Sequence, residues 1–462
     1  MKIMFYNWTP INIPNLGGGV AVYTRNIIDY FSKLNHEVYF LDSGYKYDRN
    51  QKPYLKQNII ELPINYFSII NSPVPAPMGA ISYKMMELIL KDEECLKLFD
   101  DFIKRFGPFD VIHFQTLEGI SPNVLSLKQK YSKTRFIHSF HDYGCLCMNV
   151  RFWKKKVGIN CVNTNEKENC YDCVKTYSVK SSKPYFLLRN GVAVALPKFM
   201  YHILWKMKYY NVKCFGSFQN ERANRAFGAY RRYCIENLNK YVDLELAVSK
   251  RVKEIVCKYG IIEDKVVVNY IGTKVADNAI GRCLNHFDGK ILTLLYMGYA
   301  EKAKGFYFFM DALKNINCDL SRNIIVKIAS RVSAKDKINI EKLRPKFKDI
   351  IIYNGYSHDD FQKIFKEVNV GILCPLWEDN LPQVAIEMIA NGIPVIVSSN
   401  GGAKELNAHP DFVFRDMSDF VSKLEKLFMK PDVLDEYWDY ATPLISMETH
   451  VAKLMTIYEN CF

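Results

Sequence analysis

The chain has 462 residues, of which 49% are hydrophobic and 24% charged, values typical of a globular protein large enough for two domains. Its net charge of +13 favours an anionic partner, and because no zinc-finger, RNA-recognition or KH signature accompanies it, we expect no nucleic acid. The N-terminus has no long apolar run, so we expect no secretory signal. The most apolar segment, residues 185–205, contains Arg189 and Lys198, so we expect no spanning helix.

The chain begins with the pattern of an α/β domain. Residues 2–6 form a short apolar run, residues 20–34 carry apolar side chains at helical spacing, and residues 37–41 suit the next strand. The GxGxxG pattern of dinucleotide binding is absent. Gly18 and Gly19 precede the helix, so they favour a close backbone approach to a ligand, with a flexible turn as the alternative.

Residues 110–114 and 135–140 are two further expected strands, and the second runs directly into His141 and Asp142. Ligands of open α/β sheets bind at the carboxyl ends of strands. His141 is therefore a candidate site residue, although most single histidines are structural.

A cysteine-rich insertion, residues 145–173, follows. Cys170 and Cys173 form a C-x-x-C pair, and Cys147 and Cys161 could complete a tetrahedral structural zinc site. The outer spacings are irregular and Cys145 is surplus, so an array of reduced thiols remains the alternative. Thirteen cysteines without a signal indicate a reducing, cytoplasmic compartment.

Residues 174–241 are rich in basic and aromatic side chains. The basic ones include Lys198, Lys206, Lys208, Arg222, Arg225, Arg231 and Arg232, and the aromatic ones Phe199, Tyr201, Trp205, Tyr209, Tyr210 and Tyr230. Aromatic insertion combined with cations that meet phosphates is typical of docking on anionic lipid. The alternative is a set of helices with a solvated cationic face.

A strand at residues 244–249, a helix at 250–259 with Ser249 as N-cap, and a strand at 265–270 complete the first domain, and a polar linker begins at Asp277. The second domain begins with a strand at residues 291–297 and a helix at 306–314. Lys302 and Lys304 lie between them, where a lysine suits a phosphate, although a surface lysine is the ordinary reading. Strands at residues 324–329 and 350–354 follow, and Gly355 and Tyr356 begin the next loop.

Residues 371–405 predict the end of a buried strand at Gly371-Ile372-Leu373, then an acidic loop, a helix and a strand. Pro382 suits the first turn of the helix, and Asn391-Gly392 a stop before the apolar run Ile393–Val397. Asp379 lies in the loop and Glu387 lies eight positions later in the helix. A carboxylate accepts two hydrogen bonds side by side, which suits paired sugar hydroxyls.

Together, Asp379, Asn380-Leu381-Pro382, Glu387 and the Gly-Ile-Pro-Val strand resemble the retaining glycosyltransferases of family 4, the sugar transferases of polysaccharide and lipopolysaccharide biosynthesis. Their hallmark is two glutamates separated by seven residues, and here Asp379 stands for the first. A second departure is Tyr299, which stands where the family has an arginine. The resemblance implies the GT-B fold, with two Rossmann-like domains facing across a cleft.

The resemblance also implies the reaction: transfer of a sugar, with retention, from a nucleotide-diphosphate sugar to a polysaccharide or lipid-linked saccharide. No catalytic cofactor is implied, and no DxD metal motif is present. The implied catalytic residues are His141, Asp379 and Lys304. The implied donor-binding residues are Gly18, Gly19, Lys302, Lys304, Gly355, Tyr356, Asn380, Leu381, Pro382 and Glu387, with Glu387 on the ribose and His141 on the donor sugar.

We therefore expect an acceptor domain at residues 1–276, a donor domain at 277–445 and a helix at 446–462 that packs back on the first domain. The expected location is the inner face of the membrane, held there peripherally. Two alternatives remain open: a GT-B nucleotide-sugar epimerase, and a non-catalytic scaffold that binds nucleotide-sugars.

Overall fold

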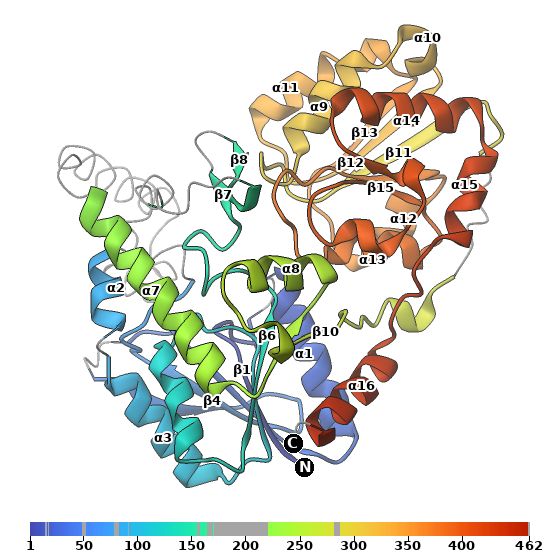
Figure 1. Cartoon of the computed structure of the whole chain (residues 1–462). Coiled ribbons are helices and arrows are strands. Elements are labelled where there is room, and N and C mark those ends of the chain that lie inside the picture. Colours follow the sequence, from blue (N-terminus) through green and yellow to red (C-terminus); the bar gives the residue numbers. More distant parts are fainter. Residues whose placement is uncertain are drawn as a thin grey trace.

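A computed structural model describes residues 1–13, 16, 18–48, 52–77, 83–90, 92–154, 158–163, 170, 220–280 and 287–460. These residues form two α/β domains, each built on its own mainly parallel sheet (Figure 1). The fold class expected from the sequence is confirmed. No helix in these ranges combines the length and apolarity needed to cross a bilayer.

The first domain contains an eight-stranded sheet with the order β10-β9-β6-β5-β1-β2-β4-β3. Its pairs are parallel except that β3 runs antiparallel to β4. The strands are β1 (Lys2–Tyr6), β2 (Glu37–Ser43), β3 (Tyr54–Asn58), β4 (Asn65–Ile70), β5 (Val111–Phe114), β6 (Arg135–Phe140), β9 (Leu244–Ala247) and β10 (Val266–Val268). The helices are α1 (Gly18–Lys33), α2 (Tyr83–Ile89), α3 (Glu94–Phe106), α7 (Asn220–Tyr241) and α8 (Lys250–Lys258).

The second domain contains a parallel six-stranded sheet with the order β13-β12-β11-β14-β15-β16. The strands are β11 (Leu292–Met297), β12 (Ile324–Ala329), β13 (Asp349–Tyr353), β14 (Val370–Leu373), β15 (Val395–Ser398) and β16 (Val413–Phe414). The helices are α9 (Phe306–Asn315), α10 (Cys318–Ser321), α11 (Ala334–Glu341), α12 (Phe361–Phe365), α13 (Gln383–Ala390), α14 (Met417–Met429) and α15 (Asp432–Glu436). All residues of β11, β14 and β15 are buried, as expected for strands covered on both faces.

Gly305 fixes how α9 begins. Its φ of 77° is in the left-handed region, and a Cβ at this position would lie 1.6 Å from the carbonyl oxygen of Cys374. Only glycine fits both conditions. The close packing sets the loop before α9, which carries Lys304, directly against the end of β14.

The helix α16 (Met447–Asn460) returns from the second domain and packs on the first (Figure 1). The Tyr23 hydroxyl lies 2.7 Å from Nε2 of His450, and the Tyr458 hydroxyl lies 2.6 Å from Nδ1 of His113. The ring of Tyr458 also stacks on Phe31, with centroids 5.6 Å apart. The last helix therefore covers buried side chains of the first domain.

A small antiparallel hairpin, β7 (Trp153–Lys154) and β8 (Ile159–Asn160), extends from the first domain toward the second. Beside it, Arg151 Nη1 pairs with Glu301 Oε2 at 2.7 Å. Asn160 Nδ2 donates to Glu378 Oε1 at 3.0 Å. The cysteine-rich insertion thus supplies contacts between the domains, which its sequence did not predict.

Candidate active site

The site lies where the carboxyl ends of the two sheets meet. Gln383 Nε2, at the start of α13, donates to the carbonyl oxygen of Gly19 in the first turn of α1 at 3.0 Å. Ser249 Oγ, the N-cap of α8, donates to the carbonyl oxygen of Asn380 at 2.9 Å. The expected role of Ser249 as an N-cap is confirmed.

An ion pair occupies the second-domain side of this junction. Lys304 Nζ lies 2.6 Å from Asp379 Oδ2 and 4.9 Å from the ring centroid of Trp377. Asp379 is buried, whereas Lys304 keeps partial exposure. The structure therefore places the lysine expected to bind the diphosphate in contact with the acid expected to bind the donor sugar.

Asn380, Leu381 and Pro382 continue the loop, and Pro382 is the N-cap of α13. The Asn380 side chain is 4% exposed, yet neither its Oδ1 nor its Nδ2 has a hydrogen-bond partner among the described residues. Nε1 of the buried Trp377 is also without a partner in this part of the chain. Buried polar atoms normally form hydrogen bonds, so these atoms have unused capacity for a polar ligand.

Glu387 lies inside α13 and is buried, facing the loop after β13. Burial, followed by the nearby charge of Glu387, raises the pKa of Tyr356. Arg331, which the sequence reading missed, follows β12, and its Nε would lie 3.6 Å from a Cβ built on Gly355. The expected ribose-binding residue Glu387 and the expected donor-binding residue Tyr356 therefore share one edge of the sheet with Arg331.

His141 follows β6 in the first domain. Its Nε2 lies 2.8 Å from Gln115 Oε1, and its ring centroid lies 4.7 Å from that of Tyr23. Burial lowers the pKa of His141 to about 3, so the ring is neutral at physiological pH. Because the amide oxygen can only accept, Nε2 carries the proton and Nδ1 is left as an acceptor.

Two acids and a tyrosine lie beside His141. Asp142 accepts from the Gly144 amide at 2.7 Å and shares a hydrogen bond with the buried Glu118, and burial raises the pKa of Asp142. The Tyr143 hydroxyl is buried without a partner among the described residues. Burial, then the charges of Glu378 and Asp379, raise its pKa, which places this hydroxyl near the acidic loop of the second domain.

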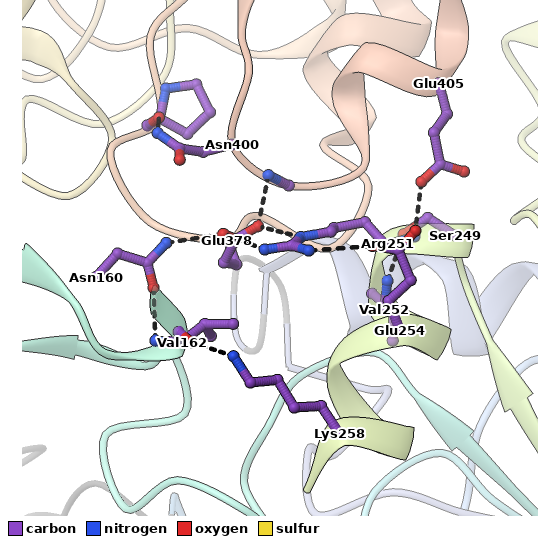
Figure 2. A network of polar contacts seen from close by, with 12 residues as sticks. Asn160, Val162, Ser249, Arg251, Val252, Glu254, Lys258, Glu378, Asn400 and Glu405 are labelled. Carbon is purple, nitrogen blue, oxygen red and sulfur yellow. Dashed lines mark hydrogen bonds and ion pairs between the residues drawn. The ribbon is translucent and has the colours of Figure 1, made fainter. Parts of the chain in front are cut away.

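Glu378 is the main residue that the sequence reading missed. Its carboxylate accepts from Arg251 Nε at 2.9 Å, Arg251 Nη2 at 2.8 Å and the Gly401 amide at 2.9 Å, besides Asn160 (Figure 2). Burial opposes the charged form, but the Arg251 hydrogen bonds hold the pKa of Glu378 below its usual value. The only sequence signal was an acid directly before Asp379.

Two further residues of the loop before α9, Lys302 and Tyr299, are exposed. Lys302 is exposed, and its Nζ would lie 2.7 Å from a Cβ built on Gly158 in the loop between β7 and β8. Tyr299, at the position where the resemblance expects arginine, is 59% exposed. The structure therefore directs Lys302 toward the hairpin, while Lys304 contacts Asp379.

The described cysteines of the expected zinc site are Cys147, Cys161 and Cys170, whereas Cys173 lies outside the described residues. All three thiols act electrostatically on Tyr259, and Arg231 Nη2 donates to Cys170 Sγ at 3.4 Å. Within the described ranges, no group of three or more histidine, cysteine or acidic side chains is arranged to hold a metal. Because Cys173 is not among these residues, the four-cysteine zinc site stays a prediction.

Much of the expected membrane-docking region, residues 198–219, lies outside the described residues. Four of its side chains are described in α7: Arg225 and Arg232 are exposed, whereas Tyr230 and Arg231 do not fit that role. Tyr230 is 1% exposed, and Arg231 Nε donates to the Leu146 carbonyl at 2.6 Å while its guanidinium covers the ring of Tyr259. The prediction that these two side chains face a membrane is wrong, because both pack inward against the cysteine-rich insertion.

A family model matches the second domain. Residues 291–430 match the family model described as "Glycosyl transferases group 1". An uncharacterized glycosyltransferase of Methanocaldococcus jannaschii is 27% identical over an alignment of 191 residues that covers 38% of this chain. The match spans about half, 48%, of that relative's length.

Solved structures resemble the whole chain at low sequence identity. The α,α-trehalose-phosphate synthase of Burkholderia xenovorans, solved with glucose-6-phosphate, superposes with a TM-score of 0.61 at 11% identity and covers 100% of both chains. Sucrose-phosphate synthase of Thermosynechococcus elongatus gives 0.59 at 12% identity, covering 99% of this chain and 98% of its own. Anabaena HepE, solved with UDP and glucose, gives 0.55 at 11% and covers 100% of both chains. The fold is therefore GT-B, and residues 291–430 are similar to the glycosyltransferase group 1 model.

Proposed function

We propose that this GT-B protein is a retaining glycosyltransferase that moves a sugar from a nucleotide-diphosphate sugar to a polysaccharide or lipid-linked saccharide. One observation carries the proposal: buried polar groups that have no hydrogen-bond partner among the described residues lie near the pair of Lys304 and Asp379. Asn380 and Trp377 supply such groups from the second domain, and Tyr143 supplies one from the first. A sugar presents the hydroxyl groups that these atoms lack.

The donor half of the mechanism is electrostatic. Lys304 leaves Asp379 to bind the diphosphate and stabilises the negative charge that develops as the glycosidic bond breaks. Glu387 accepts hydrogen bonds from the ribose hydroxyls. Arg331, beside Gly355, is a second cation for the nucleotide, which matters because Tyr299 replaces the arginine expected in the first loop.

The first domain supplies the other half of the site. His141 is neutral and contacts the donor sugar by hydrogen bonding through Nδ1, with Gln115 holding the opposite nitrogen. Asp379 and the backbone from Asn380 to Pro382 position the same sugar. Gly18 and Gly19, at the N-terminus of α1, approach the donor phosphates from the other side.

The proposed acceptor rests on the charge of the chain. The chain carries a net charge of +13, and the stretch around Lys198–Tyr210 combines cations with aromatic side chains. These features favour a peripheral position on the inner, anionic face of the membrane, where lipid-linked saccharides are accessible. One solved relative has glucose-6-phosphate bound, so a phosphorylated sugar belongs in the same acceptor screen.

The test begins with nucleotide-sugars. A thermal-shift screen of UDP-, GDP-, ADP- and dTDP-sugars selects the donor, calorimetry gives its dissociation constant, and product analysis with saccharide acceptors reads transfer and anomeric configuration. The proposal predicts binding and acceptor-dependent release of the nucleotide with a retained anomer. Donor turnover to an isomeric nucleotide-sugar without an acceptor identifies an epimerase, and binding without turnover identifies a scaffold; either outcome rejects the proposal.

A further inference from the structure

We propose that Glu378 is a positioning residue that ties the donor loop, residues 377–382, to the first domain. Asp379 then reaches its working position only when the two domains are closed on each other. The inference rests on the proposed function, because it assigns Asp379 to the donor sugar. It adds a residue pair, Glu378 and Arg251, that the proposed chemistry does not use.

The carboxylate of Glu378 is buried at the domain boundary, with 1% of the residue exposed. Both of its oxygens are occupied: Arg251 Nε and the Gly401 amide contact Oε2, and Arg251 Nη2 and Asn160 Nδ2 contact Oε1 (Figure 2). Only the Gly401 contact lies within the second domain. The paired contact with Arg251 is the bidentate geometry that makes arginine–carboxylate pairs strong and directional.

Arg251 is itself held in place. It occupies the first turn of α8, whose exposed amides bind a second acid of the other domain: Glu405 accepts from the Lys250 amide and from the Arg251 amide, each at 2.8 Å. Tyr270 donates to the same carboxylate at 2.7 Å. The second domain therefore contacts both the backbone and the guanidinium of Arg251, and the arginine forms a fixed point on the first domain.

Adjacent side chains of the donor loop point to different partners. Glu378 points to Arg251 in the first domain, whereas Asp379 points to Lys304 in the second. The backbone here has little room, because a Cβ on Gly401 would lie 2.6 Å from the Asp379 amide nitrogen and 2.2 Å from its carbonyl oxygen, to which the Gly402 amide donates. A shift of Glu378 is therefore transmitted to Asp379.

The arrangement links domain closure to chemistry. When the domains separate, Glu378 loses three of the four hydrogen bonds that it accepts from described residues, and the donor loop loses its support on one side. Small displacements of a positioning group lower the rate of reaction far more than they lower binding. Arg251 and Glu378 are thus expected to affect kcat, while nucleotide affinity depends on Lys304 and Glu387.

Site-directed variants of the full chain test this proposal. Arg251→Met and Glu378→Gln remove the pair from either side, and Arg251→Lys keeps the charge without the bidentate geometry. Glu254→Gln is the matched control, because Glu254 pairs with the same arginine through Nη1 at 3.0 Å but is largely exposed. Melting temperature, donor dissociation constant, kcat, KM and the radius of gyration from small-angle scattering are measured for each variant.

We expect Arg251→Met and Glu378→Gln to lower kcat about tenfold or more, with the dissociation constant for the nucleoside diphosphate changed by less than about threefold. The double variant should be no slower than either single variant, because both remove one interaction. Arg251→Lys should recover part of kcat, and Glu254→Gln should behave as wild type. Scattering should show a larger radius of gyration for the two disrupted variants.

Three results overturn the inference: kcat within about twofold of wild type in both variants, an equal loss in Glu254→Gln, or an unchanged radius of gyration. A lower melting temperature alone with unchanged kcat makes the pair structural and also rejects it. If the wild-type protein transfers no sugar, the proposed function fails separately. The scattering comparison then still decides whether Glu378 holds the domains together.

Discussion

Lys304 Nζ and Asp379 Oδ2 lie 2.6 Å apart, so the proposed ligand of the diphosphate and the proposed ligand of the donor sugar form an ion pair with each other. The two residues come from loops that are 75 positions apart and meet at the carboxyl ends of β11 and β14. When a nucleotide-sugar binds, Lys304 and Asp379 therefore each exchange their contact with the other for a contact with the ligand.

Lys304→Met should weaken nucleoside diphosphate binding by about tenfold or more, because a hydrogen bond to a charged group contributes about 1.5–3 kcal/mol. Lys302→Met is the matched control, since Lys302 lies against Gly158 and is exposed. Calorimetry measures both variants. Equal losses in the two variants would show that the loop attracts phosphate only through its net charge.

Glu387→Gln should weaken donor binding by about tenfold, because an amide cannot accept two hydroxyl hydrogen bonds as a carboxylate does. The ribose assignment makes a sharper prediction. Wild type should prefer the ribonucleotide to its 2′-deoxy form, and the variant should lose that preference. A preference that survives in Glu387→Gln would place the carboxylate elsewhere on the ligand.

Acid should destabilise the protein through its buried histidines. Burial lowers the pKa of His141 to about 3 and that of His450 to about 4, whereas an unfolded histidine titrates near about 6.5. Between these values the unfolded chain binds more protons, so the free energy of unfolding falls as the pH falls from about 6.5 to about 4, by up to about 1.4 kcal/mol per pH unit for each histidine.

Urea unfolding at several pH values measures how the free energy of unfolding changes with pH, and His450→Gln should make this pH dependence weaker. The Tyr23 hydroxyl can still bond to the glutamine amide, which limits the loss at neutral pH. Identical slopes for the variant and wild type would mean that His450 binds no extra proton on unfolding.

The cysteine-rich insertion should bind zinc as a structural ion or bind no metal at all. Replacing Cys170 and Cys173 with serine should lower metal content and melting temperature before it lowers kcat, because metal binding to such loops is coupled to folding. Cys318→Ser is the control, since Cys318 is exposed in the second domain. Absence of zinc in freshly purified protein, with normal stability of the double variant, would leave only reduced thiols.

Neutralising Lys206, Lys208 and Arg232 with glutamine should release the protein from anionic vesicles and spare nucleotide-sugar binding. Each cation near an anionic surface contributes about 1 kcal/mol, and added salt should weaken the interaction. The matched control neutralises Lys335, Lys337 and Lys342, which are exposed on the second domain. Cosedimentation that is the same for neutral and anionic vesicles would show that the basic stretch is only a solvated face.

The architecture could be predicted because periodicity and glycine placement are local signals. The strand end, loop, helix and strand predicted for residues 371–405 correspond to β14, the donor loop, α13 and β15. The hairpin β7–β8 was missed because its strands have two residues each, too few for any period to show.

The site could be predicted only in part, for a geometric reason. Glu378 and Asp379 are adjacent acids, and nothing local says which one faces the other domain. The answer depends on Arg251, which is 127 positions away, and on α8 meeting the donor loop. Gln115 was missed for the same reason, since its link to His141 exists only because β5 and β6 are neighbours in the sheet.

The return of α16 to the first domain has a consequence for the order of synthesis. Phe31 and His113 leave the ribosome before the second domain is made, whereas the tyrosine that covers both, Tyr458, is translated after that domain. Part of the apolar surface of the first domain therefore stays exposed until the second domain and α16 have been made. A nascent chain stalled before Met447 would present that surface to chaperones, and a separately expressed α16 peptide would bind to it.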